Sequence, residues 1–400
     1  YKKQSAIYAN MKAFIVNRVG DIGLLLGVIL VFIYTDTLYY ADFFTKLTPL
    51  SEKTISIGLM SLDLLPILSL LFFIGAAAKS AQVPLHFWLP DSMEGPTPIS
   101  ALIHAATMVT AGIFMVARLS PLYDLSGYVL NIILIIGLIT AFFMGLVALV
   151  QNDIKRIIAY STISQLGYMT VALGATYYSF AIFHLLTHAF FKALLFLCAG
   201  SIIMKCHHEQ NIDKMGGLRK VMPYTFYTYL IGAFSLAGFP MFSGFYSKDI
   251  IIDLFKYEGN MLAYSFLVLG IFVTTLYTFK ILFKVFFGDN KLNIQPTDKV
   301  EHDDVIIIPL LALSVPSLII GFALFDSVLF KGFFDTSISD YSQVNQIYNG
   351  FIISSQAFTL HAFTTLNFFL LILGIYIAYL LYYKNIKLKD SFINILALPI

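Results

Sequence analysis

One segment of the chain, residues 178–204, constrains the fold more than any other. Its sequence, YSFAIFHLLTHAFFKALLFLCAGSIIM, is apolar and long enough to cross a bilayer, since a spanning helix needs about 20 mostly apolar residues. The segment nevertheless carries His184, His188 and Lys192 at intervals of four residues. This spacing puts all three side chains on one face of a helix. A lysine at the bilayer centre costs about 2.5 to 3.5 kcal/mol, so we expect this face to meet protein or water.

The three basic side chains admit different interpretations. A lone histidine in a membrane helix is as often a hydrogen-bonded packing residue as a functional one. His184 and His188 could bind zinc, but no nearby acid or thiol completes a ligand set, and Lys192 would repel the metal. Three ionisable groups in a row favour steps of a proton path. Lys192 is the strongest candidate, because it lies too deep in the apolar run to reach water easily.

The composition is that of a membrane protein. Hydrophobic residues make up 58% of the chain and charged residues 12%, whereas soluble domains carry about 25% charged residues. We therefore predict an all-α polytopic membrane protein. The net charge of +2 gives no sign of nucleic-acid binding. Cys198 and Cys206 match no metal motif, and we expect no disulfide between them, because Cys198 lies in a span.

Hydropathy predicts about ten transmembrane helices, with no soluble domain between them. The longest connection, 326–362, is expected to lie at the membrane interface. Loops on one side of the predicted topology hold most of the basic residues, whereas the other side holds only Lys46, Lys53, Arg118, Lys256 and Lys331. This asymmetry predicts that both chain ends face the cytoplasm or mitochondrial matrix. The predicted spans are 13–34, 57–79, 97–118, 127–150, 157–175, 178–204, 225–254, 262–286, 305–325 and 363–383.

Two of these spans are expected to be interrupted. In the second, Lys79 precedes the prolines Pro84 and Pro90, which break helices. In the seventh, FSLAGFPMFSGFYSKD (234–249) puts glycine and proline at mid-span, directly before Lys248 and Asp249. Interrupted spans in two parts of a chain are typical of ion pathways in transporters built from repeats. The breaks lie five spans apart, which suggests a five-helix repeat.

The third predicted span also carries a histidine that we expect to be buried. His104 lies among small residues that allow helices to approach closely. The hydroxyls of Ser100, Thr107 and Thr110 could hold water beside it. From the residues alone, His104 is as well explained by packing as by a proton relay.

Four long motifs stand out in the chain. They are KSAQVPLHFWLPDSMEGPTPISALIHAATMVTAG (79–112), NDIKRIIAYSTISQLGYMTVALG (152–174), HLLTHAFFKALLFLCAGSII (184–203) and GFPMFSGFYSKD (238–249). The chain resembles chain 5 of the proton-pumping NADH:ubiquinone oxidoreductase, respiratory complex I, strongly over residues 11–290 and loosely beyond. The large subunit of Mrp-type sodium/proton antiporters usually has a lysine, and the plastid relative an alanine, where this chain has Thr110. Thr110 and STISQLGYM therefore favour the respiratory family.

The resemblance implies a fold of two inverted five-helix repeats, each with a broken helix and a half-channel. Residues 1–120 would be the later part of the first repeat, 121–290 the second repeat, and 291–400 C-terminal helices and a loop. It implies a central axis of buried basic residues with an exit to the outer side by Lys248 and Asp249, while Asp21 matches a family acidic position. The implied axis consists of Lys79, His104, His184, His188, Lys192 and Lys248.

The resemblance also implies a mechanism and an assembly. Because burial penalises a charged lysine, we hypothesise that charge shifts along the axis move protons, driven by quinone reduction in other subunits. The chain would be a subunit of the H⁺-translocating NADH:ubiquinone reductase in the mitochondrial inner membrane or bacterial plasma membrane. The sequence has no flavin, iron–sulfur or nucleotide motif, so these cofactors are expected in partner subunits. Expected partners are other membrane-arm subunits, including a chain 4-like antiporter subunit, and lipid, but no nucleic acid.

The chain also departs from the family. Members have about five further spans before the equivalent of Met11, including a glutamate that pairs with the first lysine, and a lateral helix and final span after the last span here. We expect a second polypeptide to supply the missing helices, or the chain to be partial. Lys79 is then expected to lack this glutamate partner within this chain. Two other functions stay open: a subunit of an Mrp-type sodium/proton antiporter, or a structural fragment of the membrane arm that does not pump.

Overall fold

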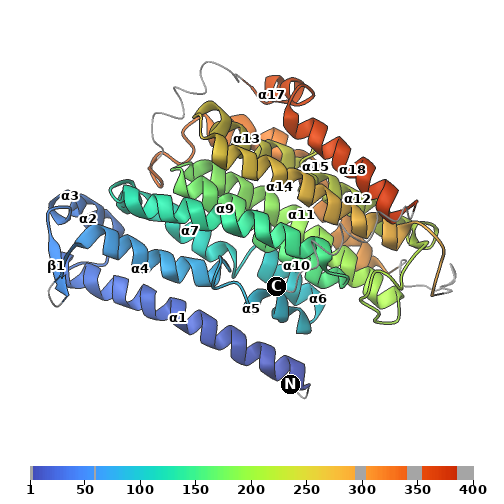
Figure 1. Cartoon of the computed structure of the whole chain (residues 1–400), viewed down its shortest axis with the longest axis horizontal. Coiled ribbons are helices and arrows are strands. Elements are labelled where there is room, and N and C mark those ends of the chain that lie inside the picture. The colour runs from blue at the N-terminus through green and yellow to red at the C-terminus, as the bar shows by residue number, and fades with distance from the viewer. Residues whose placement is uncertain (1–2, 58–59, 293–302, 340–353, 385–400) are drawn as a thin grey trace.

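Long apolar helices dominate the computed structural model, which describes residues 3–57, 60–292, 303–339 and 354–384 (Figure 1). Six helices of this described part are long and apolar enough to cross a membrane, and a bent pair makes a seventh span. The six comprise α1 (Gln4–Thr35), the pair α6 (Thr97–Ala105) and α7 (Thr110–Arg118), α9 (Gly127–Val150), α11 (Tyr178–Lys205), α14 with η3 (Met261–Ile281 and Leu282–Phe286) and α15 (Asp304–Leu329).

Most predicted spans coincide with helices of the described residues, whereas the count of ten spans stays a prediction, because six or seven described helices are long and apolar enough to cross a membrane. Predicted span 157–175 is α10 (Ile154–Gly174), and 363–383 is α18 (Leu366–Tyr382), which follows α17 (Ser355–Ala362) at a bend of 53°. Part of the predicted interfacial segment 326–362 lies outside the described residues, as does the C-terminal end after 384. Short elements complete the described chain: α2 (Tyr40–Thr45), α3 (Leu47–Leu50), α8 (Ser120–Asp124) and η2 (Leu218–Lys220).

The second span begins later than predicted. The chain first forms a β-hairpin in which β1 (Thr54–Ile57) pairs antiparallel with β2 (Met60–Asp63). The helix α4 (Leu64–Lys79) starts only after Asp63, whose backbone is extended. The predicted start at residue 57 is therefore wrong. The reason is that β-branched Ile55 and an alternating apolar–polar pattern favour a strand, although the same residues raise the hydropathy.

Both predicted interruptions are confirmed. The helix α4 ends at Lys79, and the chain then forms only short turns, α5 (Trp88–Asp91) and η1 (Ser92–Glu94). The seventh span divides into α12 (Pro223–Ala237) and α13 (Ser243–Tyr257). Gly238 ends α12 with a φ of 87°, a left-handed conformation that glycine adopts without strain.

The third span contains a break that the sequence did not indicate. Between α6 and α7 the helical hydrogen bonding stops over four residues. The Thr107 hydroxyl donates to the Leu102 carbonyl, and the Thr110 hydroxyl donates to the Thr107 carbonyl. Such side-chain hydrogen bonds compete with those of the helix, and here they accompany a break that contains neither proline nor glycine.

The helix α11 lies at the centre of the molecule (Figure 1). It packs against α6, α7, α10, α12, α13 and α15. The helices α1 and α4 pack together along one edge, and α14 and α18 pack together towards the other. A helix that is enclosed in this way can carry ionisable side chains, because they face protein instead of lipid.

Close helix contacts depend on glycines. A Cβ atom added at Gly167 of α10 would lie 2.4 Å from the backbone nitrogen of Ala141 in α9. Similar clashes would occur at Gly137 and Gly174 of the same helix pair. The α9–α10 contact therefore brings the two backbones nearer than any side chain at these positions would allow.

We expect Gly167→Ala to reduce the amount of folded chain in the membrane, because overpacking costs about 1–3 kcal/mol. Thermal aggregation of the detergent-solubilised protein would measure the effect. The matched control is Gly127→Ala, since nothing lies within 4 Å of a Cβ at Gly127. Equal stability of the two variants would contradict the packing argument.

Candidate functional site

The basic face of α11 is completely buried. His184, His188 and Lys192 are each 0% exposed, so this face meets protein, as the spacing predicted. The rings of His184 and His188 lie 6.2 Å apart, and Phe191 packs against both. The three side chains form a row along the core of the described helices. Their role as steps of a proton path stays a prediction.

Lys192 has a hydroxyl as its partner. Its Nζ donates to Oγ of Ser161 in α10 at 2.5 Å, and the Ser161 hydroxyl donates in turn to the Ile158 carbonyl. The charge of Lys248 is close enough to repel that of Lys192. The ammonium group therefore lies in the core with a neutral hydrogen-bond partner and a second cation nearby. The hydroxyl stabilises its charge only a little, and the second cation repels it.

His184 links α11 to two other helices. Its Nδ1 lies 2.9 Å from Oγ of Ser247 in α13, and its Nε2 lies 3.2 Å from Oε1 of Gln165 in α10. The Ser247 hydroxyl also lies 2.6 Å from the Thr187 hydroxyl. With the Gln165 amide in this orientation, Nε2–H donates and Nδ1 accepts. Ser247 directly precedes Lys248, so the histidine row reaches the second interrupted span.

His188 lies between His184 and Lys192 on the basic face of α11. Among the described residues neither ring nitrogen of His188 has a hydrogen-bond partner, and the charges of Lys192, His184 and His104 act on the ring. His188 on α11 is therefore close enough to His104 on α6 for their charges to interact.

Lys248 follows the break between α12 and α13. It is 0% exposed, and its Nζ lies 5.2 Å from the centroid of the Tyr168 ring. Among the described residues its Nζ has no hydrogen-bond partner. A cation over an aromatic face gains about 0.5–2 kcal/mol, which is much less than hydration provides. The adjacent Asp249 attracts its charge.

The helix α13 continues the polar row with a residue that the sequence analysis missed. Asp249 and Asp253 are 5% and 4% exposed. The Nδ2 of Asn367 in α18 donates to Oδ1 of Asp253 at 3.3 Å. The spacing of four between Asp249 and Asp253 could have indicated a shared helix face. By contrast, Asn367 approaches from a distant helix and carried no signal.

Lys79 lies beside a carboxylate that the sequence analysis did not pair with it. Its Nζ lies 3.1 Å from Oδ1 of Asp21 in α1, whereas the expected absence of the family's glutamate partner from this chain stays a prediction. The expected pair within α1 is also present, with Arg18 at 3.6 Å from Asp21. The close packing of α1 on α4 explains the Lys79 pair, because a Cβ on Gly20 would lie 2.3 Å from that of Ala78.

His104 is buried at the side of α11. It is 0% exposed, its ring lies 4.9 Å from that of Phe196, and its Nε2 lies 3.3 Å from the Ser92 hydroxyl. The hydroxyls of Ser100 and Thr110 bond to backbone carbonyls. Thr110 thus begins α7 and supports its first turn. The sequence analysis overlooked Ser92, because a single serine in a loop carries no signal.

The described residues contain no group of three His, Cys, Asp or Glu side chains that could hold a metal ion. The site therefore consists of amines, imidazoles, hydroxyls and carboxylates. These groups can accept and release protons along a row, and they come from α1, α4, α6, α10, α11 and α13.

Comparisons with known proteins give a consistent result. Residues 1–277 match the family described as NADH:quinone oxidoreductase/Mrp antiporter, TM. The chain is 48% identical to the NADH-quinone oxidoreductase subunit L of Neisseria meningitidis serogroup A, over 96% of this chain and 61% of that protein. It is 42% identical to the NADH-ubiquinone oxidoreductase chain 5 of Dictyostelium citrinum, over 100% of this chain and 60% of that protein.

The chain thus spans about three fifths of the length of these curated relatives. A solved structure with a similar fold is that of the Mrp complex from Dietzia sp. DQ12-45-1b, with a TM-score of 0.75. At 22% identity it covers 99% of this chain and 43% of the other, and the likeness is one of fold alone. The match over residues 1–277 and the identities of 42–48% mean that this chain belongs to the NADH:quinone oxidoreductase/Mrp antiporter transmembrane family.

Proposed function

We propose that the chain is a proton-translocating membrane-arm subunit of an NADH:quinone oxidoreductase. Protons move along the row formed by Lys79, His104, His184, His188, Lys192 and Lys248, in which Lys79 is partly exposed and the other five are fully buried. Quinone reduction in other subunits drives them. The observation that carries the proposal is the complete burial of Lys192 and Lys248, where a serine hydroxyl is the hydrogen-bond partner of the first Nζ and a tyrosine ring lies beside the second. The names of the curated relatives support the coupling to quinone reduction.

The physical argument concerns charge in a poorly solvated core. Burial disfavours the charged form of a lysine, and a second cation nearby disfavours it further. When Lys248 gives up its proton, repulsion at Lys192 falls, and Lys192 holds a proton more readily. Charge therefore alternates between neighbouring positions, which moves protons in one direction if the ends are gated. The exit to the outer side passes Lys248 and Asp249, and the buried Asp253 extends it.

The remaining parts of the assembly come from partners. The flavin and iron–sulfur clusters belong to other subunits, and neighbours include a chain 4-like antiporter subunit and lipid. We divide the chain as 1–120, later part of the first repeat, 121–290, second repeat, and 291–400, C-terminal helices and loop.

We place both ends on the matrix or cytoplasmic side of the mitochondrial inner membrane or bacterial plasma membrane. Two connections that carry basic residues, 151–156 and 203–210, lie around one cleft together with the connection 90–97, which supports a common side for the three. Arg118, which belongs to the poorer set, lies elsewhere, over the rings of Tyr40 and Phe44.

One alternative has an observation in its favour. The fold resembles that of an Mrp complex, so a sodium/proton antiporter subunit without redox partners is the second candidate. The identities of 42–48% to oxidoreductase subunits support the first candidate more strongly. Sodium transport by the purified assembly without NADH oxidation would favour the antiporter. A purely structural role in the membrane arm requires that loss of the buried lysines leaves pumping unchanged.

We expect Lys192→Met to leave the complex assembled but to lower severely the number of protons pumped per NADH oxidised. Methionine fills a similar volume but has no titratable group, so the row is interrupted. Quenching of a pH-sensitive dye in inverted membrane vesicles, normalised to NADH oxidation, measures the ratio. Lys220→Met, at an exposed position, is the control. Normal pumping by the assembled Lys192→Met variant would remove Lys192 from the path.

We expect Asp21→Asn to reduce pumping only partly, by less than about tenfold. The Lys79–Asp21 pair is about one-third exposed, and such a pair contributes about 1 kcal/mol or less, where 1.4 kcal/mol is a factor of ten. Asp21→Glu should retain most pumping, since it keeps the carboxylate. Asp36→Asn, at the exposed end of the same helix, should change nothing. A loss as large with Asp21→Glu as with Asp21→Asn would show that the charge is not what matters.

A further inference from the structure

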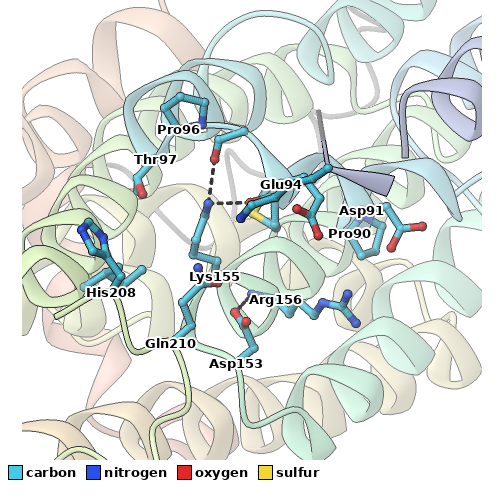
Figure 2. Close-up of a pocket in the computed structure, with 14 residues that line it drawn as sticks. Pro90, Asp91, Glu94, Pro96, Thr97, Asp153, Lys155, Arg156, His208 and Gln210 are labelled. Atoms are coloured by element: carbon cyan, nitrogen blue, oxygen red, sulfur yellow. Dashed lines mark hydrogen bonds between the residues drawn. The ribbon is translucent and has the colours of Figure 1, made fainter. Parts of the chain in front are cut away.

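A polar cleft of about 380 Å³ opens beside the interrupted second span. Figure 2 shows side chains from η1, from the start of α10 and from the loop after α11 around it. Its polar lining includes Asp91, Glu94, Asp153, Arg156 and His208. Both signs of charge surround the cleft, so it suits water and protons better than an ion of one sign.

The turn that lines this cleft also approaches the buried row. Ser92 is half-buried in η1, and its neighbours Asp91 and Met93 line the cleft. Its Oγ lies 3.3 Å from Nε2 of the fully buried His104 and 2.6 Å from the Leu89 carbonyl oxygen. The Ser92 hydroxyl thus has two acceptors within reach but only one proton to donate.

A second side chain fixes the turn that carries Ser92. Lys155 of α10 is 4% exposed, and its Nζ donates to the Met93 and Gly95 carbonyls at 2.5 and 2.8 Å (Figure 2). These carbonyls follow Ser92 within the same turn. Its charge also acts on His104.

The start of α10 is itself held in place from the other side. Lys280 of α14 donates to the carbonyls of Leu149 and Gln151 at 2.8 and 2.6 Å. The link between α9 and α10 is therefore tied to α14, and Lys155 ties α10 to η1. The hydrogen bonds of Lys155 and Lys280 therefore connect the turn that carries Ser92 to α10 and α14.

We propose that this cleft is the mouth through which protons reach the buried row, that the Ser92 hydroxyl passes them to His104, and that Lys155 is the positioning residue that holds Ser92 there. The inference rests on the proposed function, since it supplies the uptake step of the same path.

The transfer balances without any change in electrons. When Nε2 of His104 carries no proton, the Ser92 O–H donates to it. The O–H bond breaks as the Nε2–H bond forms, and the Ser92 oxygen takes a replacement proton from hydronium in the cleft, which leaves water. His104 then donates Nε2–H to the Ser92 oxygen, so the hydroxyl proton turns to the Leu89 carbonyl. The loaded state therefore cannot accept a second proton by the same route.

The charges around His104 favour its unloading into the row. Lys155 from α10 and Lys192 from α11 both act on it, and His188 of α11 is also near. A proton on His104 is repelled by both lysines when they are charged. Uptake is therefore most favourable when Lys192 is neutral and ready to receive.

The test compares proton pumping per NADH oxidised by the assembled complex in inverted membrane vesicles. Ser92→Ala removes the hydroxyl, and we expect a loss as large as that of Lys192→Met. Ser92→Thr keeps the hydroxyl and should restore at least half of the pumping. Lys155→Met should show the same loss as Ser92→Ala, and the double variant should lose no more, because both act on one step. Lys220→Met, at an exposed position outside the lining of the cleft, should pump normally.

Each outcome separates the two claims. Normal pumping by Ser92→Ala, with a loss in Lys192→Met, would overturn the inference and leave the proposed function standing. Failure of Ser92→Thr to restore pumping would show that the hydroxyl is not the carrier. Normal pumping by Lys192→Met as well would overturn both claims. If Lys155→Met does not assemble, Lys155→Gln replaces it, because glutamine retains an N–H donor. If the losses of Lys155→Gln and Ser92→Ala multiply in the double variant, the two residues do not act on one step, which would contradict the inference.

Discussion

Two lysine ammonium groups in a core that gives them little stabilisation are the constraint on which the rest of the structure depends. Lys192 bonds to a serine hydroxyl, and Lys248 lies over a tyrosine ring. Removing a charge from water costs several kcal/mol unless it is paired. The helices around α11 therefore have to exclude lipid completely while leaving polar side chains in the row. The glycine contacts of α9 and α10 contribute to this enclosure by bringing the backbones close.

The breaks in the helices have a common consequence. Each interruption brings polar groups into the apolar core, where an unbroken helix would present only side chains. The end of α4 leads to the turn that carries Ser92 to His104, and the break before α13 brings Ser247 to His184. Lys155, at the start of α10, donates to carbonyls of such a turn, those of Met93 and Gly95. Broken helices and buried basic residues are thus parts of one arrangement.

Much of this arrangement could be predicted from the sequence, because it depends on local patterns. Apolar length located most spans, the spacing of His184, His188 and Lys192 predicted their common buried face, and proline and glycine predicted the two interruptions. Contacts between distant helices were missed, since no spacing encodes them: the Lys79–Asp21 pair, the Ser161 partner of Lys192 and the Asn367–Asp253 bond. The hairpin at 54–63 was missed because hydropathy does not distinguish an apolar strand from the start of a span.

The central claim is that the buried side chains form one connected path. The most direct measurement is a double-variant cycle across Lys192 and Lys248, using methionine at each position and proton pumping per NADH oxidised by the assembled complex reconstituted into liposomes. Two steps of one path should give a double variant that pumps no worse than the poorer single variant. Losses that multiply would mean that the two lysines act independently, and would contradict a single row of proton carriers.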